Sequence, residues 1–336
     1  MIKEDWTYTS PTRFTGLGLE SAAATIKTGS LPVGITLRDL TPEAFATLLP
    51  PTHPALSALA LPGECKKLVV EGKISAPLTV EILAAAHRAG APRLKLVLAP
   101  GSALTLIESP TGPADSFLGL GLVIELGEGA RLTHLRLQEA AATHSQLALL
   151  KVTQAARSSY QHLALSTGAA LWRHEVEVAL AGENADCRFD AISLLRGTQH
   201  GDVTTRIRHL APRCTSRQRI RSVLAEQASG VFQGLIHVAP HAQKTDGQQN
   251  SRALLLSDTA SMNSKPELEI FADDVKCGHG STVGALDPLA LFYLQARGIP
   301  EAEARWLLIE AFVSELLDEA PEAATLAARS WLEALP

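Results

Sequence analysis

Short runs in which hydrophobic and polar residues alternate fill the central part of the chain, from about residue 67 to residue 284. The clearest runs lie at 94–98, 104–108, 122–126, 132–137, 175–180, 203–207 and 268–272. A period of two places successive side chains on opposite faces of an extended strand, so each run predicts one strand. The pattern as a whole predicts a long all-β domain made of many short strands.

Turn signals separate these runs, and most of them contain glycine. They fall at Pro100-Gly101-Ser102, Gly127-Glu128-Gly129, Thr167-Gly168, Gly182-Glu183-Asn184 and Gly197. Two architectures account for such a series. One is a sandwich or barrel of about 7–10 strands. The other is a parallel β-helix, which coils strand–turn–strand units of about 20 residues and fits better because it needs no intervening helices. The irregular spacing of the turn signals leaves both open, and the strict six-residue period of a left-handed β-helix is absent.

The last fifty residues have a helical pattern instead. Asp287 is a favourable N-cap, Pro288 suits the first helical position, and Gly298 lies just past the predicted end of a helix of about three turns. A second helix begins at Pro300 and ends at Pro321, and a third amphipathic helix follows at 322–335.

The second of these helices carries a single apolar stripe. Its residues recur at intervals of three and four: Trp306, Ile309, Phe312, Val313, Leu316 and Leu317. The stripe either packs on the chain's own β domain or forms a docking surface for a partner protein. The organisation that we predict is a mixed N-terminal segment at 1–66, which includes a short helix at 42–49 capped by Thr41, a β core at 67–285 and a helical subdomain at 286–336.

Composition excludes several classes of protein. The formal net charge of −5 argues against a general nucleic-acid binder, and 4% aromatic residues disfavour base-stacking surfaces. The first five residues are too polar to open a signal peptide, and no apolar run approaches the ~18 residues of a membrane span. Without a secretion signal, the four dispersed cysteines are expected to be free thiols in the cytoplasm. No phosphate-binding loop is present, so the chain shows no sign of binding ATP itself.

The most reactive pair of side chains lies where the β pattern meets the helical one. Cys277 and His279 belong to the segment 276–280, which we expect to form a compact turn. If this segment is extended instead, the two side chains share one face and lie about 6.5–7 Å apart. Thiolate and imidazole can both bind a metal ion or a small cluster. Two ligands are too few for a closed site, so a second chain must supply the others; the alternative is a buried cysteine beside a hydrogen-bonded histidine.

Other polar groups are weaker candidates. Asp273 and Asp274 are adjacent, so on a strand they point to opposite faces and are expected to be solvated carboxylates rather than an acid–base pair. Six arginines share parity within two runs, which favours a solvated ladder on exposed strand faces over an anion site: Arg206, Arg208, Arg213, Arg217, Arg219 and Arg221. Cys187 and Cys214 are expected in the core, and His237 and His241 are given no role.

A longer motif surrounds the Cys277–His279 pair. Residues 266–284 read PELEIFADDVKCGHGSTVG and residues 291–299 read LFYLQARGI. This order resembles the C-terminal signature of the SufB/SufD family of iron–sulfur cluster assembly proteins, and the likeness extends over about residues 90–320. The chain is similar to the SufD type, because the SufB type reads H-E-A where this chain has His279-Gly280-Ser281 and therefore lacks a carboxylate at Gly280. It is short before Trp6, where the family commonly has an N-terminal helical region.

The resemblance implies a fold and a site. The core is expected to be a right-handed parallel β-helix that carries a C-terminal helical subdomain. A transient iron–sulfur cluster or iron is expected at the interface with a SufB-like subunit that pairs through the β-helix ends and delivers the sulfur. His279 is its ligand from this chain, Cys277 lies beside it, and nothing is bound permanently to the isolated chain.

The resemblance also implies partners. The helical tail is expected to dock a SufC-like ABC ATPase through Phe292, Tyr293, Arg297, Gly298, Trp306, Ile309, Phe312 and Val313. No nucleic acid or membrane partner is expected, and the isolated chain can form a homodimer. The function predicted is that of a non-catalytic SufD-like scaffold. Two alternatives stay open, an exported-type β-helix polysaccharide lyase and a metal-free homo-oligomeric β scaffold.

Overall fold

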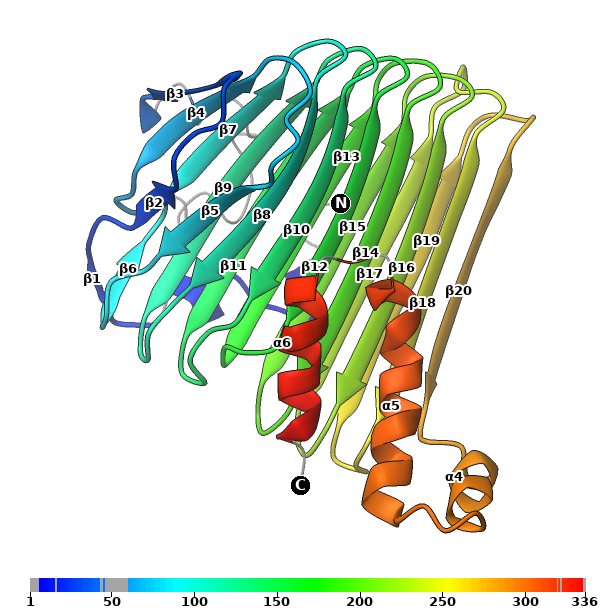
Figure 1. Cartoon of the computed structure of the whole chain (residues 1–336). Helices are drawn as coiled ribbons and strands as arrows, with labels where there is room; N and C mark the ends of the chain where they lie inside the picture. Colours follow the sequence, from blue (N-terminus) through cyan, green and yellow to red (C-terminus); the bar gives the residue numbers. More distant parts are fainter. Residues whose placement is uncertain are drawn as a thin grey trace.

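The computed structural model describes residues 6–15, 17–42, 45, 60–318, 320 and 322–334. Within them the chain forms a parallel β-solenoid of about eight turns, in which successive strands alternate between two sheets (Figure 1). The first sheet contains β3 (Ile35–Asp39), β4 (Cys65–Val70), β7 (Arg93–Leu98), β9 (Phe117–Leu126), β11 (Ser145–Gln154), β13 (Leu171–Leu180), β15 (His200–His209), β17 (Ser229–Val238) and β19 (Ser261–Ile270), with β1 (Glu20–Ser21) and β6 (Arg88–Gly90) beside them.

The second sheet lies opposite the first. It contains β2 (Thr25–Thr28), β5 (Leu78–Leu83), β8 (Ala103–Thr111), β10 (Arg131–Gln138), β12 (Ser159–Ser166), β14 (Asp186–Leu195), β16 (Thr215–Leu224), β18 (Asp246–Leu255) and β20 (Lys276–Gly284). From β4 and β5 onward the neighbouring strands of both sheets are parallel, which confirms the predicted parallel β-helix and rules out the sandwich.

The coils are longer than predicted. Phe117 of β9 pairs with Ser145 of β11, so one coil advances the chain by 28 residues, and the later pairing of Ser229 with Ser261 spans 32. The expected unit of about 20 residues was wrong because the strands reach ten residues each. Much of β9, β13 and β14 is buried on both faces and therefore does not alternate.

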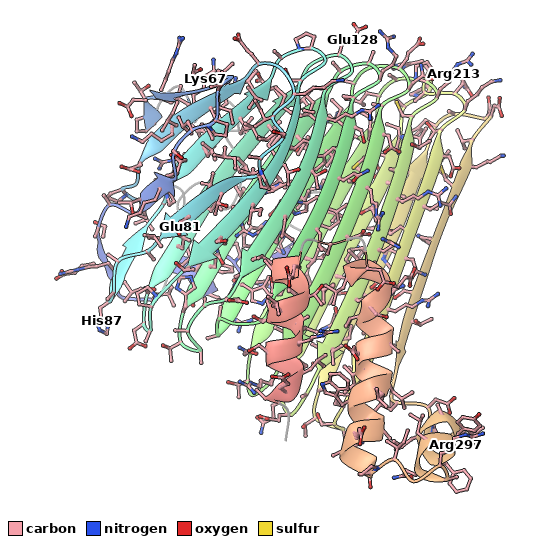
Figure 2. The ribbon with its side chains drawn as sticks, viewed as in Figure 1. Lys67, Glu81, His87, Glu128, Arg213 and Arg297 are labelled. Atoms are coloured by element: carbon pink, nitrogen blue, oxygen red, sulfur yellow. The ribbon has the colours of Figure 1, made fainter. Side chains whose placement is uncertain are left out.

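One series of turns stacks along an edge of the solenoid. In each turn a residue in the left-handed region (φ between 56° and 70°) donates its N–H to a carbonyl of the next coil: Gly101, Gly129, Arg157, Asn184, Arg213 and Lys244. Figure 2 labels Glu128 and Arg213 on this edge. The turns at Gly101 and Gly129 confirm two of the predicted turn signals, but four of the six positions in this series carry a residue other than glycine in the left-handed conformation.

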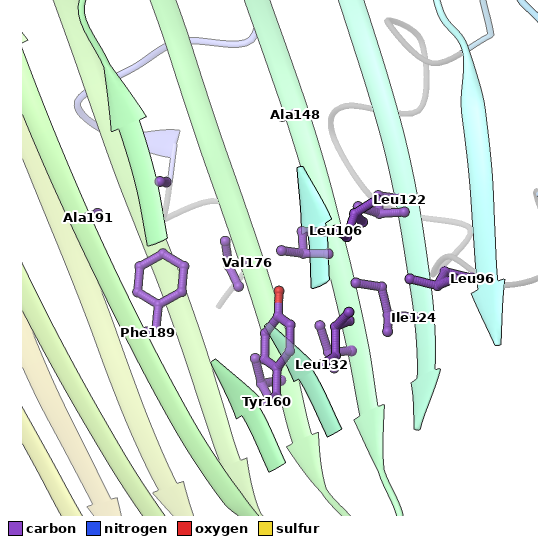
Figure 3. Packing of buried hydrophobic residues seen from close by; sticks show 14 of the residues in the cluster. Leu96, Leu106, Leu122, Ile124, Leu132, Ala148, Tyr160, Val176, Phe189 and Ala191 are labelled. Atoms are coloured by element: carbon purple, nitrogen blue, oxygen red, sulfur yellow. The ribbon is translucent and has the colours of Figure 1, made fainter. Parts of the chain in front are cut away.

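The core lies between the two sheets. Figure 3 shows Leu106, Leu132, Tyr160, Val176 and Phe189 meeting there, and all of them are buried. The predicted core positions of Cys187 and Cys214 are confirmed. All four cysteines are free thiols, as expected.

A charged group also lies inside this core. Glu108 accepts a hydrogen bond from His134 Nε2 at 3.0 Å and forms an ion pair with Arg136. Burial by itself favours the neutral carboxyl, but the charge of Arg136 and the hydrogen bond from His134 lower the pKa of Glu108 to about 2. The carboxylate is therefore ionised and compensated within the solenoid.

Helices cover the outer face of the second sheet. The helical region consists of α4 (Pro288–Gln295), α5 (Glu301–Leu317) and α6 (Glu322–Glu333). Figure 1 shows that α5 and α6 lie over the strands, while α4 projects beyond them. Ile309, Val313 and Leu316 of α5 are buried in one cluster with Leu165 and Ile192 of the sheet. Of the two interpretations of the apolar stripe, packing on the chain's own β domain is therefore the one confirmed.

The elements near the two ends of the described chain can be compared with the predicted helices. Asp287 caps α4 as predicted, since its Oδ1 accepts from the N–H of Leu289 at 2.9 Å, and the helix ends at Gln295, sooner than expected. At the other end, α1 (Thr12–Thr15) and Trp6 pack on the outer face of the first sheet. The short helix expected at 42–49 lies outside the described residues except at 42 and 45. Within the described part of the chain, no helix combines the length and apolarity needed to cross a membrane.

Close approach of the coils at the turns generates a prediction. A Cβ on Gly182 would lie 2.1 Å from the backbone nitrogen of Ala156 in the preceding coil. Because both elements are backbone and cannot rotate away, Gly182→Ala should destabilise the fold by about 1–3 kcal/mol. Urea denaturation followed by circular dichroism measures this.

The matched control is Gly284→Ala at the end of β20, where a Cβ would meet nothing within 4 Å. Its unfolding midpoint should stay at the parental value. Equal midpoints for both variants would show that the turn tolerates a side chain and that the close approach of the two coils does not require glycine.

Candidate functional site

The solenoid ends in two strands that are hydrogen-bonded on one side. Among the described residues β19 pairs only with β17, and β20 pairs only with β18. Three apolar side chains are exposed at this end, Ile270 by 39%, Phe271 by 59% and Val283 by 47%. We call β19, β20 and the turn 271–275 between them the open end. Unpaired strand edges with exposed apolar residues favour pairing with another chain.

Cys277 and His279 lie on β20 at the open end. The compact turn expected at 276–280 was wrong, because this segment pairs in register with β18 and is extended throughout. His279 is the register partner of Gln249, whose side chain lies inside the solenoid against Gly234 of β17. Residues in register share a face, so Cys277 and His279 both belong to the inner face of the last coil.

The thiol of Cys277 is packed among apolar side chains. It borders a cluster that contains Ile236, Val238 and Ala272. Burial raises the pKa of the Cys277 thiol above its ordinary value, and the charge of Asp246 adds to this rise, while a backbone hydrogen bond at Gly247 opposes it. Because the thiolate is the metal ligand and the nucleophile, this environment keeps Cys277 in the protonated form near neutral pH.

His279 has different surroundings. Its side chain is exposed, and its register neighbour Gln249 is 3% exposed with neither amide atom hydrogen-bonded. Across the described residues, no set of three or more His, Cys, Asp or Glu side chains is arranged to hold a metal ion. The open end therefore presents one accessible imidazole from this chain, with a thiol and an amide behind it.

The other polar groups agree with expectation in part. Asp273 and Asp274 are exposed, which confirms the prediction of solvated carboxylates, although they lie in the turn before β20 rather than on a strand. His237 of β17 lies 3.1 Å from a carboxylate oxygen of Glu269, a contact that the sequence did not indicate. His241 lies in the following turn, where its Nε2 is 2.8 Å from the carbonyl oxygen of Leu210.

The predicted solvated arginine ladder was wrong at three positions. On β15, the side chain of Arg206 is 18% exposed and lies 3.5 Å from Glu175. On β16, the side chain of Arg221 is 3% exposed and that of Arg219 is 23% exposed, because α5 covers this face of the sheet. Both pair with Glu315 of α5, Arg221 at 2.8 Å and Arg219 at 3.4 Å. The sequence offered one signal, since Glu315 lies next to the apolar stripe of α5.

The residues expected to dock a partner divide into two groups. Phe292 and Tyr293 on α4 are 68% and 55% exposed, and Arg297 stacks on the ring of Tyr293 with its Cζ 3.5 Å from the centroid. Figure 2 labels Arg297 beside the projecting helix, in the turn that follows α4. Gly298 follows in a left-handed turn (φ 84°). In contrast, Ile309 and Val313 are buried against the second sheet, and Trp306 and Phe312 are half-buried beside them.

Comparison with known proteins adds to this picture. A family model described as SUF system FeS cluster assembly, SufBD core domain, matches residues 82–312. The chain is 37% identical to the Escherichia coli iron–sulfur cluster assembly protein SufD over 231 residues, which cover 67% of this chain and 54% of that protein. It is 35% identical to the SufBD family protein slr0076 of Synechocystis over 240 residues, 68% of this chain and 53% of the relative. It is 34% identical to the chloroplastic protein ABCI7 of Arabidopsis thaliana over 234 residues, 68% and 49% of the two chains.

The fold and the open end define a class: a two-sheet parallel β-solenoid with one free end and a helical appendage packed on its side. Within that class, the chain belongs to the SufBD family of the SUF iron–sulfur cluster assembly system, which confirms the resemblance read from residues 266–299. The chain spans about half the length of the curated relatives it matches.

The environment of Cys277 generates a prediction. Because only the thiolate reacts, a thiol whose pKa is raised is alkylated slowly near neutral pH and faster as the pH increases. Iodoacetamide at pH 7.5 should therefore label Cys277 several times more slowly than free cysteine, with a rate that is still rising at pH 9. Peptide mass spectrometry measures the rate at this position.

The buried Cys187 is the internal reference and should remain unlabelled while the chain is folded. Labelling of Cys277 as fast as free cysteine at pH 7.5 would contradict the environment described.

Proposed function

We propose that this chain is a SufD-like, non-catalytic scaffold subunit of a SufBCD-type iron–sulfur cluster assembly complex. The observation that carries the proposal is the placement of His279, within the matched family region, on the free end of the solenoid. A single accessible imidazole cannot hold iron or a cluster alone. It can serve as one ligand of a site that another chain completes.

The partner at the open end is proposed to be a SufB-like subunit. Each sheet ends there in a strand whose outer edge has no partner among the described residues, and the exposed Ile270, Phe271 and Val283 offer apolar area beside the free backbone groups. An interface that continues the strands satisfies those backbone groups and covers the apolar side chains. When the SufB-like subunit is absent, we propose that a second copy of this chain binds at the open end.

At such an interface the roles of this chain's own residues follow from their surroundings. His279 offers a ring nitrogen to iron or to a nascent cluster, which is cargo rather than a resident cofactor. Cys277 stays behind it as a protonated thiol in the wall of the site. The remaining ligands and the sulfur come from the partner subunit.

The helical subdomain is proposed to dock a SufC-like ABC ATPase. Support comes from α4, which projects from the body of the chain (Figure 1). Leu289, Phe292 and Tyr293 on this helix are exposed by 76%, 68% and 55%. Large apolar side chains concentrated on one short exposed helix favour burial against a partner. Ile309 and Val313 do not take part directly, because they anchor α5 to the sheet.

The role of His279 generates a prediction. His279→Ala removes the accessible ligand without changing the strand pairing of β20, so complex formation should persist while cluster yield falls by at least fivefold. The measurement is anaerobic reconstitution of the complex with SufB-like and SufC-like partners, followed by iron and sulfide analysis and visible absorption. His87→Ala, an exposed histidine in the turn before β6, is the matched control.

Normal cluster yield from the His279→Ala complex would remove the ligand role. A complex that fails to assemble would instead indicate that His279 belongs to the subunit contact, and size-exclusion chromatography separates the two results.

The docking role of α4 generates another prediction. Phe292→Ser combined with Tyr293→Ser deletes exposed apolar area and leaves the α5–sheet contact intact, so affinity for the SufC-like ATPase should fall by at least tenfold. Isothermal titration calorimetry with the purified ATPase measures the dissociation constant. Leu326→Ser on α6, where the leucine is 58% exposed, is the control and should bind as the parent does. Unchanged affinity in the double variant would place the docking surface elsewhere.

A further inference from the structure

The C-terminal half of α5 is tied to the second sheet by Arg221 of β16. Nη2 of this arginine donates to Oε2 of Glu315 at 2.8 Å, and its Cζ lies 5.8 Å from the centroid of the Phe312 ring. The Arg221 side chain is 3% exposed. A guanidinium so far removed from water depends on the partners that the fold provides.

Arg219, two residues earlier, is compensated differently. Its Nε and Nη2 donate to the two carboxylate oxygens of Asp190 on β14 at 2.9 Å and 2.8 Å, within the sheet itself. Glu315, in contrast, is the only carboxylate at ion-pair distance from Arg221 in the described chain. If α5 shifts, Arg219 keeps its main partner and Arg221 loses its counter-charge.

Arg221 has a further partner on the next strand. Its Nη1 donates to Oδ1 of Asn250 on β18 at 3.1 Å. Because Oδ1 accepts this bond, the orientation of the amide is set and Nδ2 faces β20. There Nδ2 lies 3.6 Å from the position that a Cβ would occupy on Gly280, the register partner of Asn250 and the residue after His279.

We infer that Arg221 is a positioning residue that couples α5 to the strand carrying His279, through Glu315 on one side and Asn250 on the other. Movement of α5 changes the counter-charge of a buried guanidinium, and that guanidinium orients the amide of Asn250, which faces Gly280 of β20. The functional consequence of this coupling rests on the proposed function. In the proposed complex, a partner that moves the helices acts on the His279 strand through these contacts.

Hydrogen–deuterium exchange of the whole chain tests this coupling without any partner. Glu315→Ala removes the counter-charge, and amides of residues 276–284 should then exchange about fivefold faster or more, together with those of α5. Glu310→Ala is the matched control, because Glu310 lies on the same helix but pairs with Arg329 of α6 at 3.4 Å. Faster exchange in α5 with unchanged exchange at 276–284 would overturn the inference.

A double-variant comparison tests the route. In an Asn250→Leu background, Glu315→Ala should no longer alter exchange at 276–284, since the contact that carries the effect is already absent. An effect of the same size in both backgrounds would show that the helix acts on β20 by another path and would overturn the role of Arg221.

The state of His279 itself is read from its imidazole C–H signals in NMR spectra, assigned with His279→Gln. Glu315→Ala should move these signals and Glu310→Ala should not; signals that stay in place in both variants contradict the coupling. None of these measurements needs a cluster or a second subunit. A negative result therefore overturns the coupling alone, and a failure of the scaffold role appears separately in the reconstitution assay.

Discussion

The hydrogen-bond ladder between successive coils is the constraint on which the rest of this structure depends. Each strand from β8 to β18 is paired on both sides with parallel neighbours, so its register fixes which of its residues face the core. A shift of one residue would exchange the inner and outer faces of every later coil. His279 is on the inner face beside Gln249, and Gly280 is on the outer face beside Asn250, because this register persists to the last strand.

The alternation of hydrophobic and polar residues predicted some strands of this ladder, but it does not reveal strands that are buried on both faces. The run at 104–108 was recognised because β8 alternates between buried and half-buried positions. In contrast, β14 is almost continuously buried, since Ile192 and Leu194 on its outer face pack under the helices. A strand covered on both faces loses its period of two.

The turns hid the repeat in a similar way. Gly101 and Gly129 mark the first two turns of one edge, whereas Arg157, Arg213 and Lys244 occupy the same left-handed position later. Non-glycine residues are tolerated there because the stacked backbone hydrogen bonds hold the conformation. The spacing of the glycines alone therefore looked irregular, although the left-handed position recurs in every turn of this series.

The site could be predicted only as far as its motif. Cys277 and His279 stand out by residue type, but the protonation of the thiol depends on packing from β17 that no local pattern reveals. Parity correctly put Arg219 and Arg221 on one face and could not tell that α5 covers that face. Long-range contacts between an appended helix and a distant strand are decided by the whole fold.

In the part of the chain that the structure describes, the strands of the last coil, β19 and β20, have one neighbour each, whereas every strand from β8 to β18 has two. In a solenoid, stability is approximately the sum of each coil's own contribution and of its interfaces with adjacent coils, so β19 and β20 lack one of the two interfaces that stabilise an inner coil. A subunit that continues the sheets supplies the missing interface, and by mass action the order of the His279 strand then rises with the partner's concentration. In the proposed assembly, the geometry around His279 therefore depends on the contact between the two subunits as well as on this chain.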